Sequence, residues 1–383
     1  MRINYMSIRI DTCLIILILI ISSTAQSIDW QGQASSWLTI RPNPGNDGQI
    51  GIRYIPSLTL GSPLSEKYLF DSEISANIYG TNRFYSENEP EQEGQIKPYR
   101  GWIRLSASQF GLRAGLQKIN FGSAALLRPL MWFDHIDPRD PLQLTDGVYA
   151  LLGRYYFLNN ANVWLWCLYG NDETKGWEIF PGVKNKPEFG GRLQVPLWTG
   201  EIAISAHHRV AKYEGDNQDQ GIIDQRFSEN RLGLDGKWDI GIGIWFEGTI
   251  TYVDINNILP RYNRMFNLGL DYTFDIGNGL YVVSEYLRVD FSDALFTSDE
   301  SSSLTALSSN YPLGLLDNLQ VIFYYDWDKE NTFRFVSWQR IYDQWSFYTM
   351  GFWNSTQYPL YGNKQVNNLF SGKGFQFMVV FNH

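Results

Sequence analysis

Apolar and polar residues alternate with a period of two along most of the chain after residue 26. Between residues 189 and 197 the odd positions read Phe, Gly, Leu, Val and Leu, while the even positions from 188 read Glu, Gly, Arg, Gln and Pro. The same alternation recurs over 229–237, 242–252, 266–274 and 375–381. Successive side chains of a β-strand point to opposite faces, so each segment predicts a strand with one apolar face and one polar face. No sustained 3.6-residue period and no later run of eighteen apolar residues occurs in the sequence, which disfavours helical domains and membrane helices.

The length of these segments indicates a membrane barrel. They run for about nine to twelve residues, which exceeds the usual five or six of a soluble strand and matches a tilted strand that crosses a bilayer. Trp and Tyr near the segment ends, such as Tyr149, Trp345 and Trp353, suit the two membrane interfaces. The alternative interpretation is a secreted β-sandwich or propeller in which these rings form an ordinary core.

Short and long connections alternate along the chain. The short ones are expected near 108–110, 159–161, 198–200, 239–241, 276–279, 315–318 and 342–344. The longer, polar ones are expected at 85–95, 121–147, 171–186, 213–225, 254–262, 291–302 and 355–372. Short periplasmic turns and longer outer loops are typical of outer-membrane barrels, and only the short connection 328–331 has to lie on the loop side.

The strand count follows from the position of the termini. With 304–313 taken as a strand of its own, the count becomes an even eighteen and both ends lie in the periplasm; sixteen is the alternative. We therefore predict an all-β, transmembrane, antiparallel up-and-down β-barrel formed by one domain, 26–383. Closure into a barrel leaves no free sheet edge, which a sheet within hydrocarbon requires.

The first 25 residues predict a secretory signal peptide. Arg2 and Arg9 precede an apolar run over 13–21, and four small residues follow at 22–25. The run is too short to span a bilayer, although a membrane anchor is the alternative interpretation. Cys167 is then the only cysteine of the mature chain, so an intramolecular disulfide is excluded. Export and the barrel pattern together predict the outer membrane of a Gram-negative bacterium.

Composition excludes two other classes of protein. Aromatic residues make up 16% of the chain and charged residues only 19%, which is unlike a disordered protein. The formal net charge of -9 argues against a nucleic-acid partner.

One stretch resembles a known family. Residues 115–122 read Gly-Leu-Gln-Lys-Ile-Asn-Phe-Gly and lead into a long loop with Arg128-Pro129, Asp137-Pro138 and Asp140-Pro141. This pattern resembles large porin-like barrels of bacterial outer membranes, of which the alginate-export type is an example. The resemblance covers about 35 residues and implies a channel or exporter that lies in outer-membrane lipid and is inserted by the barrel-assembly machinery. That machinery reads a terminal aromatic residue in such barrels, whereas here Asn382 and His383 follow Phe381.

The polar faces of the strands carry many arginines. The alternation predicts a lumen lined by Arg100, Arg104, Arg113, Arg154, Arg192, Arg209, Arg231 and Arg334. Guanidinium groups keep their charge and bind carboxylate or phosphate, so these side chains favour small polar solutes, anionic ones in particular. The same faces also carry carboxylates, including Glu188, Glu229, Asp235 and Glu247. A wall of ion pairs that gives rigidity and little selectivity is therefore the alternative.

The loop over 121–147 is the candidate constriction. It is long, contains several prolines, and carries Arg128, Asp134, His135, Asp137, Arg139 and Asp140. A loop of this kind either folds into the pore and narrows it or caps the barrel outside.

Catalytic and cofactor interpretations find little support in the sequence. His207 and His208 are adjacent on a strand and point to opposite faces, and no nucleophile, base and orienting group show a converging spacing. We expect no catalytic residue, cofactor or metal. The favoured function is passive diffusion or export of small polar solutes; the alternatives are a barrel-embedded hydrolase and a structural or adhesive barrel with a plugged lumen. No oligomer interface can be identified in the sequence.

Overall fold

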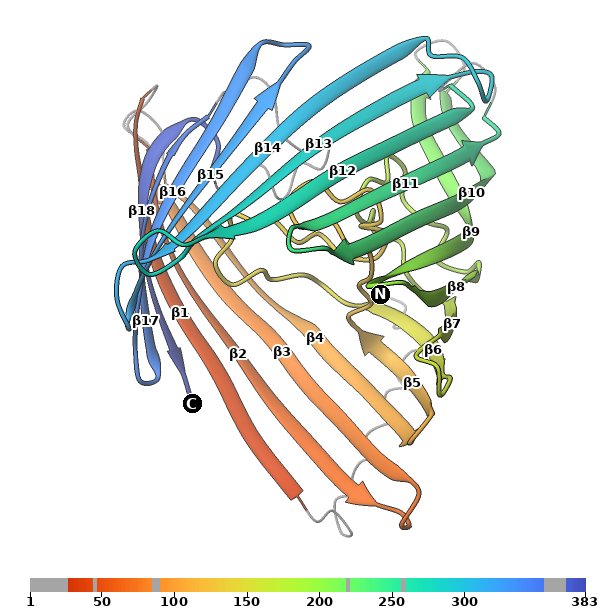
Figure 1. The fold of residues 1–383 in the computed structure, drawn as a ribbon, viewed down its shortest axis with the longest axis horizontal. Coiled ribbons are helices and arrows are strands. Elements are labelled where there is room, and N and C mark those ends of the chain that lie inside the picture. Colours follow the sequence, from red (N-terminus) through yellow and green to blue (C-terminus); the bar gives the residue numbers. More distant parts are fainter. Residues whose placement is uncertain (1–26, 44–46, 85–89, 218–220, 256–259, 355–369) are drawn as a thin grey trace.

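A closed antiparallel β-barrel accounts for the described part of the chain in the computed structural model (Figure 1). The structure describes residues 27–43, 47–84, 90–217, 221–255, 260–354 and 370–383, so the predicted signal peptide lies outside the described residues. Every strand pairs with its neighbour in sequence, and β1 pairs with β18 to close the sheet. The strands are β1 (Ser27–Asn43), β2 (Asp47–Pro63), β3 (Leu69–Phe84), β4 (Glu91–Ala107), β5 (Phe110–Gln117), β6 (Val148–Tyr156), β7 (Asn162–Leu168), β8 (Glu188–Leu197), β9 (Gly200–Asn217), β10 (Gly221–Asp239), β11 (Gly243–Val253), β12 (Tyr262–Phe274), β13 (Leu280–Ser292), β14 (Glu300–Pro312), β15 (Asp317–Asp326), β16 (Asn331–Tyr342), β17 (Trp345–Trp353) and β18 (Lys373–Asn382).

Eighteen strands confirm the predicted count, and β14 is the strand on which the even number depends. Strand length varies more than predicted, from 7 residues in β7 to 19 in β10. The predicted loop over 213–225 is wrong, because β9 and β10 continue as a ladder until Asn217 faces Gly221. Among the described residues no helix is long and apolar enough to span a membrane.

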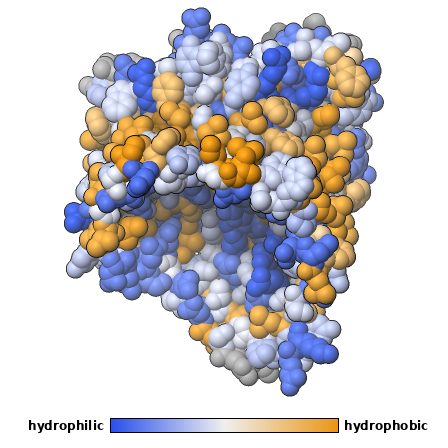
Figure 2. Space-filling view, in the orientation of Figure 1, coloured by the Kyte–Doolittle hydropathy of each residue, from blue (hydrophilic) through white to orange (hydrophobic). Residues whose placement is uncertain are grey.

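The predicted two-faced strands are present on most of the barrel. On β10, Leu232 and Leu234 are 56% and 44% exposed on the outer face, whereas Arg231 and Asp235 are buried inside. Tyr149, Trp345 and Trp353 also lie on the outside. Apolar residues cover much of the exterior and hydrophilic residues line the hollow (Figure 2). This arrangement pairs the backbone within the sheet and presents apolar side chains to lipid.

The wall from β13 to β18 departs from this pattern because its inner face is apolar as well. Ile322, Phe335 and Phe352 are almost fully buried there and belong to one cluster with Leu126 and Leu127, which come from the long connection after β5. The barrel interior along these six strands is therefore a packed core.

Arg334 is a correction to the predicted lumen. Phe333 and Phe335 occupy the inward positions of β16, and Arg334 between them is exposed on the outer face. These two aromatic side chains pack on the cluster just described, so the apolar face of β16 is its inner face. The prediction placed the polar face, with Arg334, on the inside.

Candidate pore and constriction site

Residues 118–147, here the first infolded segment, leave β5 and attach to the far wall of the barrel. Glu285 on β13 accepts hydrogen bonds from the backbone N–H groups of Ala125 (2.6 Å), Leu126 (3.1 Å) and Leu127 (2.5 Å). Glu247 on β11 accepts from the N–H groups of Ala124 (2.7 Å) and Leu130 (3.1 Å). Because both carboxylates point inward, the segment lies inside the barrel, which decides between the two positions left open by the sequence.

Residues 169–187, here the second infolded segment, pack beside the first. Gly176 N–H donates to the Asp134 carbonyl (3.1 Å), and Trp177 Nε1–H donates to the Arg128 carbonyl (2.8 Å). Lys175 Nζ reaches Glu188 on β8 at 2.9 Å. The two segments thus form one internal mass attached to the wall from β8 to β13.

The predicted constriction residues lie within this mass, and most of their charges are already paired. Arg128 binds Asp134 at 2.9 Å, and Arg139 binds Asp137 at 2.7 Å; all four are buried. His135 Nε2 lies 2.7 Å from the Thr174 carbonyl oxygen. These side chains shape the segment, and their charges are compensated within it.

Asp140, the remaining constriction residue, closes a turn of the same segment. Its carboxylate accepts from the backbone N–H groups of Leu142 (3.0 Å) and Leu144 (3.2 Å). Burial raises the pKa of the Asp140 carboxyl above its ordinary value, although these hydrogen bonds and the charge of Arg53 oppose the rise.

Three of the predicted lumen arginines belong to buried ion pairs. Arg192 binds Asp235 at 2.6 Å and 2.8 Å through two nitrogens. Arg209 binds Glu229 at 2.8 Å and the second infolded segment through Glu178 at 3.0 Å. Arg231 makes contacts with the same two carboxylates, at 2.8 Å to Glu178. The alternative of a structural ion-pair wall holds for this side of the barrel.

The wall from β2 to β6 differs, because three of its predicted lumen arginines, Arg100, Arg113 and Arg154, have no carboxylate contact in the described structure. Arg113 lies 4.4 Å from the ring centre of Trp102, and Arg154 lies 3.7 Å from that of Trp164. Arg100 donates to the Thr145 carbonyl (3.1 Å) and lies over the neighbouring ring of Tyr99. The aromatic faces hold these guanidinium groups against the wall.

Arg104 on the same wall has a carboxylate partner, since it binds Asp71 through two nitrogens. Arg83 on β3 also has one, since it lies 3.7 Å from Glu91. Two further cations belong to the wall although the sequence analysis did not single them out. Arg53 on β2 lies over the rings of Trp37 and Tyr79, at 5.3 Å and 5.5 Å. Lys118 lies at the start of the first infolded segment, and partial burial lowers its pKa. The positive charges of Arg100 and Arg128 lower this pKa further, whereas the negative charge of Asp134 raises it.

The anchors Glu285 and Glu178 were also missed by sequence reasoning. Glu285 carries a signal of an inward position, because it shares the buried face of β13 with Val283 and Leu287, while its neighbour Tyr286 is exposed. Nothing in that pattern shows which distant backbone groups it binds. Glu178 lies in a loop, where no periodic signal exists.

The histidine pair lies as expected, with His207 inside and His208 outside. Trp166 Nε1–H donates to His207 Nδ1 (3.2 Å), and His207 Nε2 lies 3.3 Å from Glu188 Oε2. His208 lies against Phe189 and Asn230 on the outer face. Among the described residues no three His, Cys, Asp or Glu side chains gather as metal ligands.

Solved structures with a similar fold come from bacterial outer membranes. OccK5 (OpdH) of Pseudomonas aeruginosa aligns with a TM-score of 0.54 and 11% identity, over 94% of this chain and 98% of that one. The anion-selective porin from Comamonas acidovorans aligns with a TM-score of 0.50 and 11% identity, over 93% and 99%. This chain has a porin-type outer-membrane fold. The fold and the apolar exterior locate the barrel in the outer membrane of a Gram-negative bacterium.

A third neighbour is Wzi of Escherichia coli, described as an outer-membrane protein involved in group 1 capsule assembly and a carbohydrate-binding β-barrel. It aligns with a TM-score of 0.54 and 10% identity, over 96% of this chain and 87% of that one. No known protein-family profile matches this chain, and neither does any curated protein. The resemblance to the alginate-export type stays a prediction.

Proposed function

We propose that the barrel is a passive channel for small anionic solutes. The observation that carries this proposal is the uneven distribution of uncompensated charge inside the barrel. Arg53, Arg100, Arg113 and Arg154 lie on β2, β4, β5 and β6 with no carboxylate partner among the described residues. The side filled by the infolded segments instead carries paired charges.

The two sides have different effects on a passing ion. A paired, buried guanidinium contributes little field to the lumen, because its carboxylate compensates it at contact distance. An unpaired guanidinium beside water attracts anions and repels cations, as charged rings do in other pores. The infolded segments narrow the lumen and bring a solute closer to the arginine wall. An anion-selective porin also occurs among the neighbours, which supports the same direction of selectivity.

Nothing in the described geometry favours catalysis by His207. Both ring nitrogens face partners of the wall, and the Ser205 hydroxyl accepts a hydrogen bond from Arg192 at 3.1 Å. We infer that diffusion through the channel involves no chemical step, and that His207 helps to hold the second infolded segment through Glu188 and Lys175.

Reversal potential in a salt gradient tests the proposal. Wild-type protein in a planar bilayer with a KCl gradient should show anion preference, and Arg113→Gln with Arg154→Gln should reduce it. Arg334→Gln is the matched control, since it removes one arginine charge from the outer face. Cation preference in the wild type, equal shifts in the variants and the control, or the absence of any conductance would overturn the proposal.

A further inference from the structure

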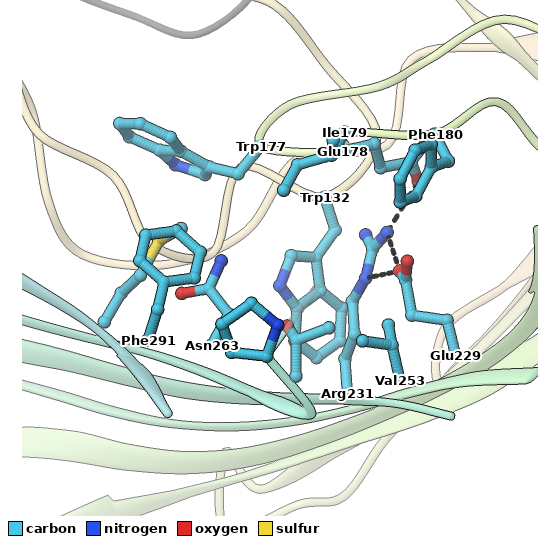
Figure 3. A pocket seen from close by; sticks show the side chains of 13 residues that line it. Trp132, Trp177, Glu178, Ile179, Phe180, Glu229, Arg231, Val253, Asn263 and Phe291 are labelled. Atoms are coloured by element: carbon cyan, nitrogen blue, oxygen red, sulfur yellow. Dashed lines mark hydrogen bonds and ion pairs between the residues drawn. The ribbon is translucent and has the colours of Figure 1, made fainter. Parts of the chain in front are cut away.

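A pocket lies between the second infolded segment and the wall from β10 to β13, toward the loop end of the barrel (Figure 3). About 560 Å³ of space lies among its lining residues when the open solvent at its mouth is counted. Its lining comes from the two infolded segments, from β10, β11, β12 and β13, and from Pro260. It lies apart from the arginine wall on β2 to β6, so the proposed channel function does not account for it.

One part of the pocket lining is aromatic. Trp132 and Trp177 come from the two infolded segments, Phe180 from the second, and Phe291 from β13 (Figure 3). The negatively polarised faces of such rings attract the weakly positive C–H groups of a ring that packs on them. A flat ligand with C–H groups on its face therefore suits this part of the lining.

The opposite part is charged but compensated. Glu178 and Glu229 together hold Arg231 and Arg209, with Arg231 Nε 2.7 Å from Glu229 Oε1 and Arg209 Nε 2.8 Å from the same oxygen. Two carboxylates face two guanidinium groups, so this part has no net charge to attract an ion. An anionic ligand would meet the two carboxylates, and a cationic one the two arginines, which favours a neutral ligand.

Asn263 and Arg231 offer hydrogen-bonding atoms to such a ligand. Within the described structure Asn263 Oδ1 is buried and has no hydrogen-bond partner. Arg231 uses Nε and Nη2 for the carboxylates, and its Nη1 points toward the middle of the pocket without a bond to the residues drawn in Figure 3. An unmet acceptor is costly when buried, so a ligand that donates to it gains affinity. A purely aromatic ligand would leave this acceptor unmet.

We propose that this pocket binds a neutral sugar ring of the pyranose type. The ring's C–H face packs on the aromatic side chains, one hydroxyl donates to Asn263 Oδ1, and another oxygen accepts from Arg231 Nη1. The site gives the outer mouth of the barrel a saccharide-binding function that is separate from the anion selectivity of the opposite wall.

Saturation-transfer difference NMR tests the proposal on the full protein in an amine-oxide detergent, which has no sugar headgroup. The probes are methyl α-D-glucopyranoside, methyl β-D-galactopyranoside and methyl α-D-mannopyranoside, with benzyl alcohol as an aromatic probe. At least one glycoside should receive saturation on its ring C–H protons. Asn263→Leu should weaken its binding by about threefold to tenfold, the effect of one lost hydrogen bond.

The matched control is Asn77→Leu, because Asn77 is also an inward asparagine with an unpartnered buried Oδ1, on β3 at the other wall. It should leave glycoside binding unchanged. Heat-modifiable mobility on gels shows that each variant is folded. Saturation of benzyl alcohol alone, no signal from any glycoside, or equal losses in the two variants would overturn the proposal. The outcome is independent of the reversal potential, so the channel and the sugar site are tested separately.

Discussion

The role of each inward arginine depends on the groups it meets. Arg209 is fully buried and touches two carboxylates, because a guanidinium taken out of water needs compensation by charge and hydrogen bonds. Arg113 is only partly buried, lies on Trp102 and keeps access to water. The same residue type therefore serves rigidity on one wall and, as proposed, selectivity on the other.

Paired substitutions separate these two roles. Arg209→Met leaves one carboxylate charge uncompensated in a buried site, so we expect a loss of about 3–5 kcal/mol in the free energy of unfolding. Arg113→Gln should change that free energy by no more than about 0.5 kcal/mol. The temperature at which heat-modifiable gel mobility is lost measures the stability of both variants. Reversal potential measures the loss of anion preference that we expect for Arg113→Gln alone. Equal destabilisation by both substitutions would contradict the assignment.

We expect Asp140 to make the anion preference of the proposed channel depend on pH. Its pKa is raised above 3.8 chiefly by burial, so the folded state binds the proton more tightly than the unfolded state does. The contribution of Asp140 to the free energy of unfolding is therefore most favourable below the ordinary pKa and is lost as the pH rises through the raised pKa. Protonation also removes a negative charge that interacts with Arg53. Anion preference should accordingly increase as the pH falls.

The variant Asp140→Asn tests this dependence. It has no charge at any pH, so its anion preference at neutral pH should exceed that of the wild type, and its change on acidification to about pH 4 should be smaller. Reversal potentials of both proteins across the pH range supply the comparison. Superimposable pH profiles would show that Asp140 does not act on the lumen.

At the scale of the elements, the two infolded segments act as one unit because they meet at a glycine. Gly176 has a φ of 50°, and a Cβ there would lie 1.5 Å from the Met131 carbonyl oxygen. Its N–H donates to the first infolded segment at Asp134. Only a residue without a side chain allows this approach of the two backbones.

Gly176→Ala should separate the segments. The clash with a backbone carbonyl forces the second infolded segment away from the first, so we expect a higher single-channel conductance and faster protease cleavage within 118–147. Gly170→Ala is the matched control, because Gly170 also has a positive φ, 86°, but a Cβ there meets no atom within 4 Å. If both alanines raise conductance equally, backbone strain and not segment contact would be the cause.

The sequence predicted most of the strands but not the segments and side chains that fill the barrel interior. Period-two alternation identified most strands, since lipid outside and polar groups inside give each strand two distinct faces. It misplaced Arg334, because Phe333 and Phe335 face an interior that is packed with Leu126 and Leu127. A local pattern cannot show that a loop more than 150 residues away occupies the lumen.

The contacts of the first infolded segment show the same limit. Its length and prolines marked it as a candidate constriction, but its position depends on Glu247 and Glu285, which lie far away in sequence. The charges singled out within it, such as Arg128 and Asp134, bind each other. Their pairing depends on the folded geometry of the segment, which composition does not determine.

At the scale of the whole molecule, closure between β1 and β18 joins the first and last strands of the barrel. The register runs from Gln33 opposite Asn382 to Asn43 opposite Lys373. His383 extends this seam by one residue, because its N–H and carbonyl bond the carbonyl and N–H of Gly32, both at 3.0 Å. Its ring also stacks on Tyr54, whose hydroxyl lies 3.0 Å from His383 Nε2.

Deletion of Asn382 and His383 tests how much of this closure the barrel needs. Most of the β1–β18 ladder remains, and Phe381 becomes the terminal aromatic residue that outer-membrane barrels commonly present for assembly. Each lost backbone hydrogen bond contributes about 0.5–1.5 kcal/mol. We therefore expect a barrel that still reaches the outer membrane and has a modestly lower unfolding temperature by gel mobility. His383→Phe, which keeps the backbone pair with Gly32, should assemble with a smaller loss of stability. Failure of the deleted chain to assemble, with normal assembly of His383→Phe, would show instead that the last two residues are required to close the seam.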